Sequence, residues 1–319
     1  MITHRGLLVH PYELDDHWLD KCVSLGLNVI GLHPVGGKRA DESLQGLLDL
    51  QHQPEFKRLL DRAASLGLKV EHEMHSLSWL VPRSLFADHP DWFRMNEEGA
   101  RIADFNICPS CKEVMAYLSD RAEELARQLP SETHRYYFWI DDVTKSRCHC
   151  PACAALTASD QMLMIVNAML EGVRRVDPEG MMPYLAYQDT LNAPTAVKPA
   201  DGVFLEFAPI YRKPEYAIND PACPENAGEI ASMPQLLALF GTKNSQVLEY
   251  WLDNSLYSHW TYPPKPFKAY DDIIAQDVAY YRDLGFERIT TFACYLGKDY
   301  IDLHGDPDLS GYGKALANP

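Results

Sequence analysis

The stretch FKRLLDRAASLGLKVEHEM, residues 56–74, contains the repeating unit that decides the fold. Its first part, Phe56 to Leu66, has the apolar spacing of an amphipathic helix, and Gly67 ends that helix. The second part, Leu68–Met74, is a short apolar run of the kind that forms a buried strand. A glycine-capped helix that leads directly into a strand is typical of parallel α/β folds.

The same unit recurs along the chain, with Leu25-Gly26 and Leu284-Gly285 as further helix stops. Helices separate most of the eight strand candidates, which are Gly6–Val9, Leu27–Leu32, Leu68–Met74, Tyr136–Ile140, Met182–Tyr187, Gly202–Phe207, Gln246–Trp251 and Arg288–Ala293. This pattern predicts an α/β protein, a (β/α)8 TIM barrel that forms a single domain over residues 1–319. An open doubly wound sheet is the alternative. It is disfavoured because no glycine-rich phosphate turn follows the first strand.

Composition restricts the partners. The net charge of −16 argues against nucleic acid and against an anionic membrane surface, since both would repel an acidic protein. No run of about 18 apolar residues is present, so a membrane span is not expected. No secretory leader precedes the first strand, which favours a cytoplasmic protein whose cysteines are thiols or metal ligands. The sequence predicts no oligomeric state.

Polar and aromatic side chains gather where the predicted strands end. In a TIM barrel all these ends lie on one face, which is where barrel enzymes keep their catalytic residues. The side chains expected there are His10, Tyr12, His33, His75, Asp141, Asp142, Tyr187, Asp189, Glu206, Glu249, Trp251 and Tyr295, and Glu73 is expected to join them in the substrate site.

The segment YYFWIDD, residues 136–142, ends the fourth strand with two adjacent carboxylates. Both can face the pocket if the chain turns at the strand end. Two nearby carboxylates repel each other when ionised, which raises the pKa of one and makes it a usable general acid. A helix N-cap or a metal clip in a loop is the alternative interpretation of Asp141-Asp142.

The third strand and its exit, EHEMH followed by SLSWLVP (residues 71–82), together with WIDD (139–142), resemble the barrels of hexosaminidase-type glycoside hydrolases of families 20 and 84. Those enzymes carry an acidic pair at the end of the fourth strand. Over most of the barrel the chain is more similar to the family known as domain of unknown function 4838. That likeness rests on His75 with WLVP (79–82), on Asp141-Asp142, on the loop CHCPAC (148–153) and on the helix that begins near Ser159.

The hexosaminidase resemblance implies a glycoside hydrolase that acts on a small-molecule carbohydrate, with specific roles for its residues. Asp142 would protonate the glycosidic oxygen and then activate water, while Asp141 would orient a 2-acetamido group that acts as the internal nucleophile. His75 and Glu73 would tune the acid. Aromatic rings would form the wall of the sugar site, and the expected ones are Tyr187, Trp251 and Tyr295.

Three alternatives remain open. A retaining glycosidase could use Asp142 with Glu249, on the fourth and seventh strands. A metal-dependent, amidohydrolase-like enzyme could hold its metal with residues 71–75 together with His10 and His33, although the first strand lacks the His-x-His of many such enzymes. A sugar-binding barrel without turnover is the third.

The cysteine spacing predicts a structural metal site. Cys148, Cys150 and Cys153 lie within six residues, and Cys108 lies in the loop after the third strand. Four thiolates from two adjacent loops suit a tetrahedral Zn²⁺, which would hold the loop that carries the acidic pair. Cys111 or His149 could replace Cys108 as the fourth ligand, and unligated thiols or disulfides are the alternatives.

Overall fold

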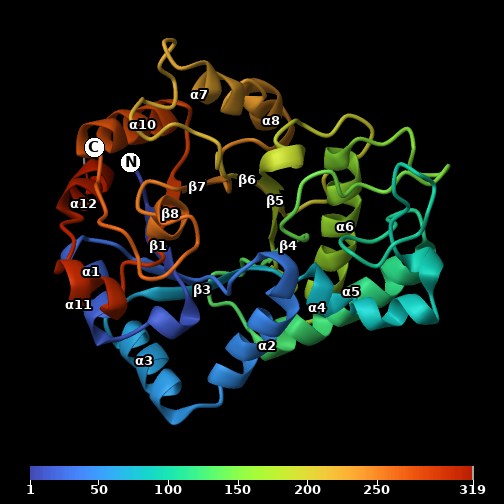
Figure 1. Cartoon of the computed structure of the whole chain (residues 1–319), viewed down its shortest axis with the longest axis horizontal. Coiled ribbons are helices and arrows are strands. Elements are labelled where there is room, and N and C mark those ends of the chain that lie inside the picture. Colours follow the sequence, from blue (N-terminus) through green and yellow to red (C-terminus); the bar gives the residue numbers. More distant parts are fainter. Residues whose placement is uncertain (318–319) are drawn as a thin grey trace.

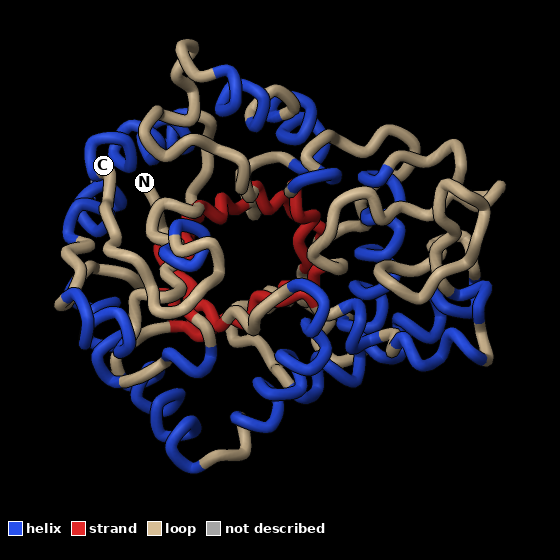
Figure 2. Tube along the Cα trace, viewed as in Figure 1, coloured by secondary structure: helices blue, strands red, loops and turns tan. Residues whose placement is uncertain are grey.

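Eight parallel strands, one from each predicted segment, form the centre of the computed structural model, which describes residues 1–317 (Figure 1). They are β1 (His4–Val9), β2 (Val29–Leu32), β3 (Lys69–His75), β4 (Tyr137–Trp139), β5 (Met182–Ala186), β6 (Val203–Phe207), β7 (Gln246–Glu249) and β8 (Arg288–Phe292). The sheet order is β4-β3-β2-β1-β8-β7-β6-β5, and the strands surround a common axis (Figure 2). The predicted TIM barrel is confirmed.

Helices cover the outside of this ring (Figure 2). The α-helices are α1 (Asp16–Ser24), α2 (Ala40–Leu50), α3 (Pro54–Ser65), α4 (Leu77–Leu80), α5 (Lys112–Gln128), α6 (Ala158–Val173), α7 (Pro224–Glu229), α8 (Met233–Phe240), α9 (Asn254–Tyr257), α10 (Asp271–Asp283), α11 (Lys298–His304) and α12 (Ser310–Ala317). Five short 3₁₀ helices lie in the loops, at Pro11–Glu13, Gly37–Arg39, Arg83–Ala87, Pro90–Trp92 and Gln188–Thr190.

The repeating unit folds as its sequence predicts. Helix α3 buries Phe56, Leu59 and Ala63 on one face and ends just before Gly67, which has a positive φ of 77°. Glycine adopts this left-handed conformation at little cost, so the chain can turn at once into β3. No helix among residues 1–317 is long and apolar enough to cross a membrane.

The ring closes least completely between β4 and β5, which are the two edges of the sheet. There, the bridge between Arg135 and Met181 joins the edges. The main-chain N–H of Tyr136 donates to the Met181 carbonyl at 2.9 Å, and the N–H of Met181 donates to the carbonyl of His134 at 2.8 Å. We call this junction the seam.

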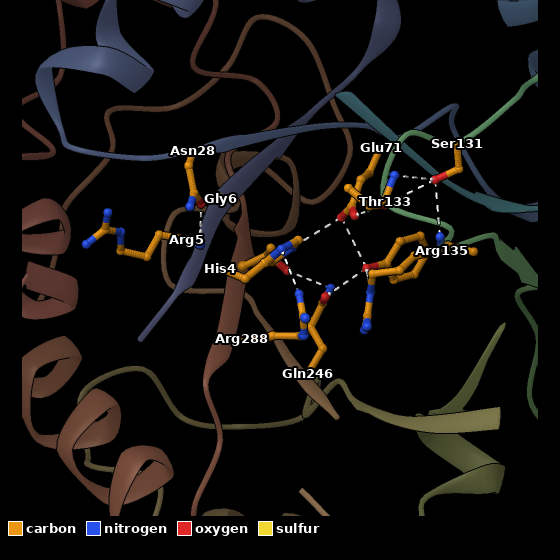
Figure 3. A network of polar contacts seen from close by, with 12 residues as sticks. His4, Arg5, Gly6, Asn28, Glu71, Ser131, Thr133, Arg135, Gln246 and Arg288 are labelled. Atoms are coloured by element: carbon orange, nitrogen blue, oxygen red, sulfur yellow. Dashed lines mark hydrogen bonds and ion pairs between the residues drawn. The ribbon is translucent and has the colours of Figure 1, made fainter. Parts of the chain in front are cut away.

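The floor of the barrel is polar rather than apolar (Figure 3). Glu71 of β3 accepts a hydrogen bond from the Thr133 hydroxyl at 2.6 Å and lies 3.2 Å from the imidazole of His4. Arg135 donates to the Tyr137 hydroxyl at 2.8 Å and stacks over the Phe204 ring. These paired charges close the end of the barrel opposite the strand exits.

Glu73 and Glu206 occupy the layer above this floor. Trp139 donates its indole N–H to Glu206 at 2.8 Å, and Gln246 donates to the other Glu206 oxygen at 3.2 Å. Both glutamates are fully buried inside the barrel. Glu73 and Glu206 were predicted to contact substrate. They lie one layer below the mouth of the barrel, because β3 and β6 continue beyond them.

Candidate active site at the mouth of the barrel

A cavity of about 530 Å³ opens at the carboxyl ends of the strands, where barrel enzymes bind their substrates. Six of the twelve residues predicted for the strand exits line it. These are His10, His33, His75, Asp142, Tyr187 and Tyr295. The rest of its wall is formed by Val35, Gly36, Gly37, Trp139, Leu185, Ile210, Leu248, Tyr250, Asp253, Ser255, Trp260, Phe292 and Cys294.

Three histidines, at the exits of β1, β2 and β3, share one hydrogen-bonding pattern. The Nδ1 of His10 lies 2.8 Å from the carbonyl oxygen of His33, and the Nδ1 of His33 lies 2.8 Å from that of Glu73. The Nδ1 of His75 lies 2.7 Å from the carbonyl oxygen of Ile140. A carbonyl oxygen only accepts, so each Nδ1 carries the proton, and the Nε2 of a neutral ring is left as an acceptor.

Burial keeps two of these rings uncharged. It lowers the pKa of His10 to about 4 and the pKa of His33 well below the ordinary value, since a buried imidazolium loses its hydration. The three rings also contact one another, with centroid separations of 5.9 Å for His10–His33 and 6.1 Å for His33–His75. We call His10, His33 and His75 the histidine row.

Asp142 brings a carboxylate into the cavity from the exit of β4. The Tyr187 hydroxyl donates to Asp142 Oδ1 at 2.9 Å. Gly36 lies so close that a Cβ there would be 3.0 Å from Asp142 Oδ2 and 2.9 Å from the His75 ring. The loop after β2 can approach this carboxylate because it has a glycine at that point.

Asp141 points away from Asp142. Its Oδ2 accepts the main-chain N–H of Asn106 at 2.6 Å and lies 3.3 Å from the guanidinium of Arg83. Burial raises the pKa of Asp141. It lines a separate, small cavity of about 40 Å³. Successive residues of an extended chain face opposite sides, so the chain does not turn enough to bring both carboxylates into one pocket.

Asp253 is the second carboxyl group in the cavity, and sequence reasoning missed it. It is the N-cap of α9, where one carboxylate oxygen accepts bonds from the main-chain N–H groups of Ser255 and Leu256. Burial raises its pKa to about 6. The sequence signal was an Asp-Asn-Ser run just after the seventh strand, which fits a helix cap as well as a site residue.

Glu249 and Trp251 lie outside the barrel wall, contrary to the prediction that they face the pocket. Glu249 pairs with Arg212 at 2.9 Å and accepts a bond from Tyr281 at 2.6 Å, while the Trp251 indole donates to Asp277 at 2.9 Å. The reason is strand alternation, because Leu248 and Tyr250 on either side of Glu249 face the cavity.

The cluster of residues 71–75 does not converge either. Glu71 lies at the floor of the barrel, His75 lies at the mouth, and His72 points outward to the Gln51 amide at 3.0 Å. These residues therefore do not form the metal site that an amidohydrolase-like enzyme would need.

Tyr12 lies at the rim of the mouth and is 57% exposed. Its ring stacks on His10 with a centroid separation of 5.2 Å, and its hydroxyl lies 3.3 Å from that of Tyr262. Tyr262 in turn packs on Tyr295, with centroids 4.3 Å apart. The three tyrosines extend the aromatic surface of the cavity toward solvent.

The four predicted metal ligands come together. The sulfur atoms of Cys108, Cys148, Cys150 and Cys153 are buried, lie within 4.8 Å of one another, and could hold a metal ion. Cys108 Sγ is 3.6 Å from Cys150 Sγ, far longer than a disulfide bond. The Met95 N–H donates to Cys148 at 3.3 Å, as N–H groups do toward thiolates. Cys111 lies outside this group and is paired with Asp91.

The cysteine cluster adjoins the loop that carries the acidic pair. Both contributing loops lie on one side of the barrel, beside α5 and α6 (Figure 1). Asn106, two residues before Cys108, holds Asp141 from both sides, because its side-chain oxygen also accepts the N–H of Asp141 at 3.1 Å. The cluster can thus position Asp142 through Asn106 and Asp141.

Comparison with solved structures supports the fold assignment. Cel5A from Thermotoga maritima, in complex with cellobiose, matches with a TM-score of 0.51 and 10% identity, over 99% of this chain and 97% of that one. The alpha-galactosidase TtGalA from Thermus thermophilus, in complex with stachyose, matches with a TM-score of 0.51 and 16% identity, over 98% and 64%. The beta-galactosidase from Marinomonas ef1 has a TM-score of 0.48, 12% identity and coverages of 91% and 54%, so the chain spans about half of it. Likenesses at these identities show the fold alone.

No curated protein matches the chain in sequence. The family model described as Domain of unknown function (DUF4838) matches residues 51–290. This range includes Asp142, Asp253 and the whole cysteine cluster, whereas His10 and His33 precede it. The match covers well over half of the sequence, and the chain belongs to the DUF4838 family.

Proposed function

We propose that the protein is a glycoside hydrolase whose two working carboxyl groups are Asp142 and Asp253. The observation that carries the proposal is that both line one cavity, which they reach from the exits of β4 and β7. Most glycosidases use a pair of carboxyl groups on either side of the bond that they cleave. Asp253 thus takes the place that the sequence had suggested for Glu249.

The surroundings of the two groups suggest their roles. Asp253 has a raised pKa of about 6, so a minor fraction of it stays protonated near neutral pH and can donate that proton to the leaving oxygen as general acid. Asp142 accepts the Tyr187 hydrogen bond, which orients its carboxyl group to act as base or nucleophile. This assignment reverses the acid role predicted for Asp142, and it removes Asp141 from contact with substrate.

The cavity wall fits a sugar. Trp139, Tyr250, Phe292 and Tyr295 supply aromatic surface on which the apolar face of a pyranose can pack. The histidine row supplies acceptors for hydroxyl protons. With Asp141 outside the cavity, that residue is not placed to orient an acetamido group as the hexosaminidase resemblance implied.

The test is a panel of aryl glycosides of varied leaving-group pKa, assayed with wild type, Asp253→Asn and Asp142→Asn. Loss of a general acid should slow glycosides with poor leaving groups by about 10²–10⁴-fold and dinitrophenyl glycosides much less. Loss of Asp142 should slow all members alike.

Asp141→Asn is the comparison for a carboxylate outside the cavity and should slow turnover far less than either cavity variant, since it acts only through the position of Asp142. If both cavity variants cleaved the panel as fast as wild type, the proposal would be wrong. If wild type bound sugars without cleaving any, a sugar-binding barrel would replace it.

We also propose that the cysteine cluster holds a structural Zn²⁺ in a protein of a reducing compartment such as the cytoplasm. Four buried sulfurs with N–H donors suit a closed Cys₄ site, in which the ion fixes loops and has no open position for substrate. The ion would supply rigidity, and the chemistry would remain with the carboxyl groups.

A further inference from the structure

The wall of the cavity carries no cationic side chain. Among residues 1–317, no lysine or arginine lines it, although the chain has 29 of them. Its charged members are Asp142 and Asp253, both carboxyl groups. An anionic ligand in this cavity would therefore meet like charge and no counter-charge.

Three cationic residues, Arg5, Arg212 and Lys298, lie away from the cavity wall. Arg212 pairs with the buried Glu249 outside the barrel wall, and Lys298 pairs with Asp302 at 2.6 Å on the surface. Arg5 belongs to the first half of β1, on the floor side of the barrel (Figure 3). The small neighbouring cavity contains Arg147, which donates to the Leu156 carbonyl at 2.8 Å.

His10 and His33 of the histidine row do not supply the missing positive charge. Each Nδ1–H is committed to a main-chain carbonyl, and burial holds His10 and His33 in the neutral form. In these two neutral rings the Nε2 atom can only accept hydrogen bonds. Such acceptors need a ligand that donates hydrogen bonds, and a carboxylate, sulfate or phosphate group only accepts them.

We propose that the cavity selects an uncharged, hydroxyl-bearing sugar residue and excludes its anionic counterparts, the uronic acids and the sulfated or phosphorylated sugars. The inference rests on the proposed glycosidase function and adds to it the class of substrate. Hydroxyl protons satisfy the histidine row, aromatic rings cover the sugar face, and the two carboxyl groups repel an anionic substituent.

The experiment compares matched methyl glycosides in both anomeric forms, glucoside with glucuronide and galactoside with galacturonide, by calorimetric binding to the wild-type protein at pH 7. We expect the neutral member of at least one pair to bind about tenfold more tightly or better, since like charges across a binding site weaken association.

A charge variant tests the cause. Val35 lines the cavity and is 44% exposed, so it accepts a longer side chain without disturbing the core. Val35→Gln is the matched uncharged control, since it has a similar length and carries no charge. Relative to this control, Val35→Lys should tighten uronide binding about fivefold, the effect of one exposed ion pair, and should not tighten the binding of neutral glycosides.

The outcomes separate the two proposals. A uronide that binds wild type as tightly as its neutral partner overturns the charge selection and leaves the glycosidase proposal standing. Equal uronide affinities for Val35→Lys and Val35→Gln overturn the electrostatic cause. If the protein neither binds nor cleaves any sugar of the panel, the glycosidase proposal fails, and the substrate class fails with it.

Discussion

Asp253 combines full burial with hydrogen bonds that all reach one of its two oxygens. Ser255 donates from both its N–H and its hydroxyl to Oδ1, and Leu256 adds a third bond to the same atom. The other oxygen remains available to hold a proton. These bonds favour the charged form, but the loss of hydration outweighs them and the pKa rises from 3.8 to about 6.

The raised pKa has a consequence for stability. A carboxyl group that binds its proton more tightly in the folded state stabilises the fold below pH 4, and this contribution disappears as the pH rises through about 6. Asp253→Asn cannot ionise and still offers an oxygen to Ser255. We therefore expect it to be more stable than wild type at pH 8, by about 1–3 kcal/mol, and much less so at pH 4.5.

Urea denaturation of both proteins at the two pH values checks this expectation. A difference in the free energy of unfolding that is the same at pH 4.5 and pH 8 would contradict it. Asp142→Asn, which removes the other cavity carboxylate, provides the comparison for a simple charge effect.

At the level of single residues, the sequence predicted which positions reach the mouth better than it predicted where their side chains point. His10, His33 and His75 follow three consecutive strands, and their shared environment could be expected from that position alone. The separation of Asp141 from Asp142 could not, because it depends on how far the chain turns after β4 and on the grip of Asn106.

Among the elements, α5 and α6 make an unusually close helix contact. Gly172 of α6 faces the main chain of α5, and a Cβ at this position would lie 1.9 Å from the Ser119 carbonyl oxygen. Backbone atoms cannot move aside as a flexible side chain can, so the helices would have to separate. Both helices flank the loops that carry the cysteine cluster (Figure 1).

Gly172→Ala should therefore lower the free energy of unfolding by about 1–3 kcal/mol, the usual cost of overpacking. Gly46→Ala in α2 is the matched control, since that glycine is exposed and a Cβ there meets nothing within 4 Å. The control should gain about 0.4–1 kcal/mol because alanine has fewer unfolded conformations. Thermal melts should place the midpoint of Gly172→Ala below that of wild type and the midpoint of Gly46→Ala above it. Two variants that both melt above wild type would refute the prediction.

The cysteine cluster links two loops that share no strand pairing, so its ligand should govern their order. We expect purified protein to contain about one zinc per chain, measured by plasma mass spectrometry. Cys150→Ser should lose the metal and melt at a lower temperature, because a structural zinc contributes directly to folding. Cys111→Ser should keep the metal, since Cys111 lies outside the cluster. Zinc-free wild type of unchanged stability would rule the site out.

Elements were the best predicted level of the structure. All eight strands follow from local apolar runs and glycine stops, which need no knowledge of distant contacts. β4 and β7 are shorter than predicted, because the backbone leaves the sheet before it reaches Ile140 and Trp251. Helices α2, α8 and α12 were not predicted, because their glycine and proline residues weaken the helical spacing of apolar residues.

For the molecule as a whole, buried carboxyl groups and buried histidines make stability depend on pH in opposite directions. Burial raises the pKa of Glu13 and of Glu229 to about 7 and that of Glu206 to about 8. From about pH 4.5 up to these folded-state pKa values, the groups keep protons that the unfolded chain has already lost, so their contribution to stability falls as the pH rises. His10 and His72, with pKa values lowered to about 4, act in the opposite direction below pH 6.5.

The midpoint of thermal unfolding should accordingly fall most steeply between about pH 6.5 and 8, where the histidines no longer offset the carboxyl groups. Scanning calorimetry from pH 4.5 to 8.5 at constant ionic strength measures it. A midpoint that rises steadily to pH 8.5 would show that the buried carboxyl groups ionise as easily as exposed ones.

The seam makes the barrel a strip that is rolled up until its two ends meet, rather than a continuous hoop. β1 and β8 pair over five residues. Within residues 1–317, by contrast, β4 and β5 are joined by the single bridge of Arg135 with Met181. Solvent deuterium should therefore exchange into the facing amides of β4 and β5 long before it reaches β1 and β8. In this strip Asp142 follows β4, the strand at one end, whereas Asp253 follows β7, the third strand from the other end.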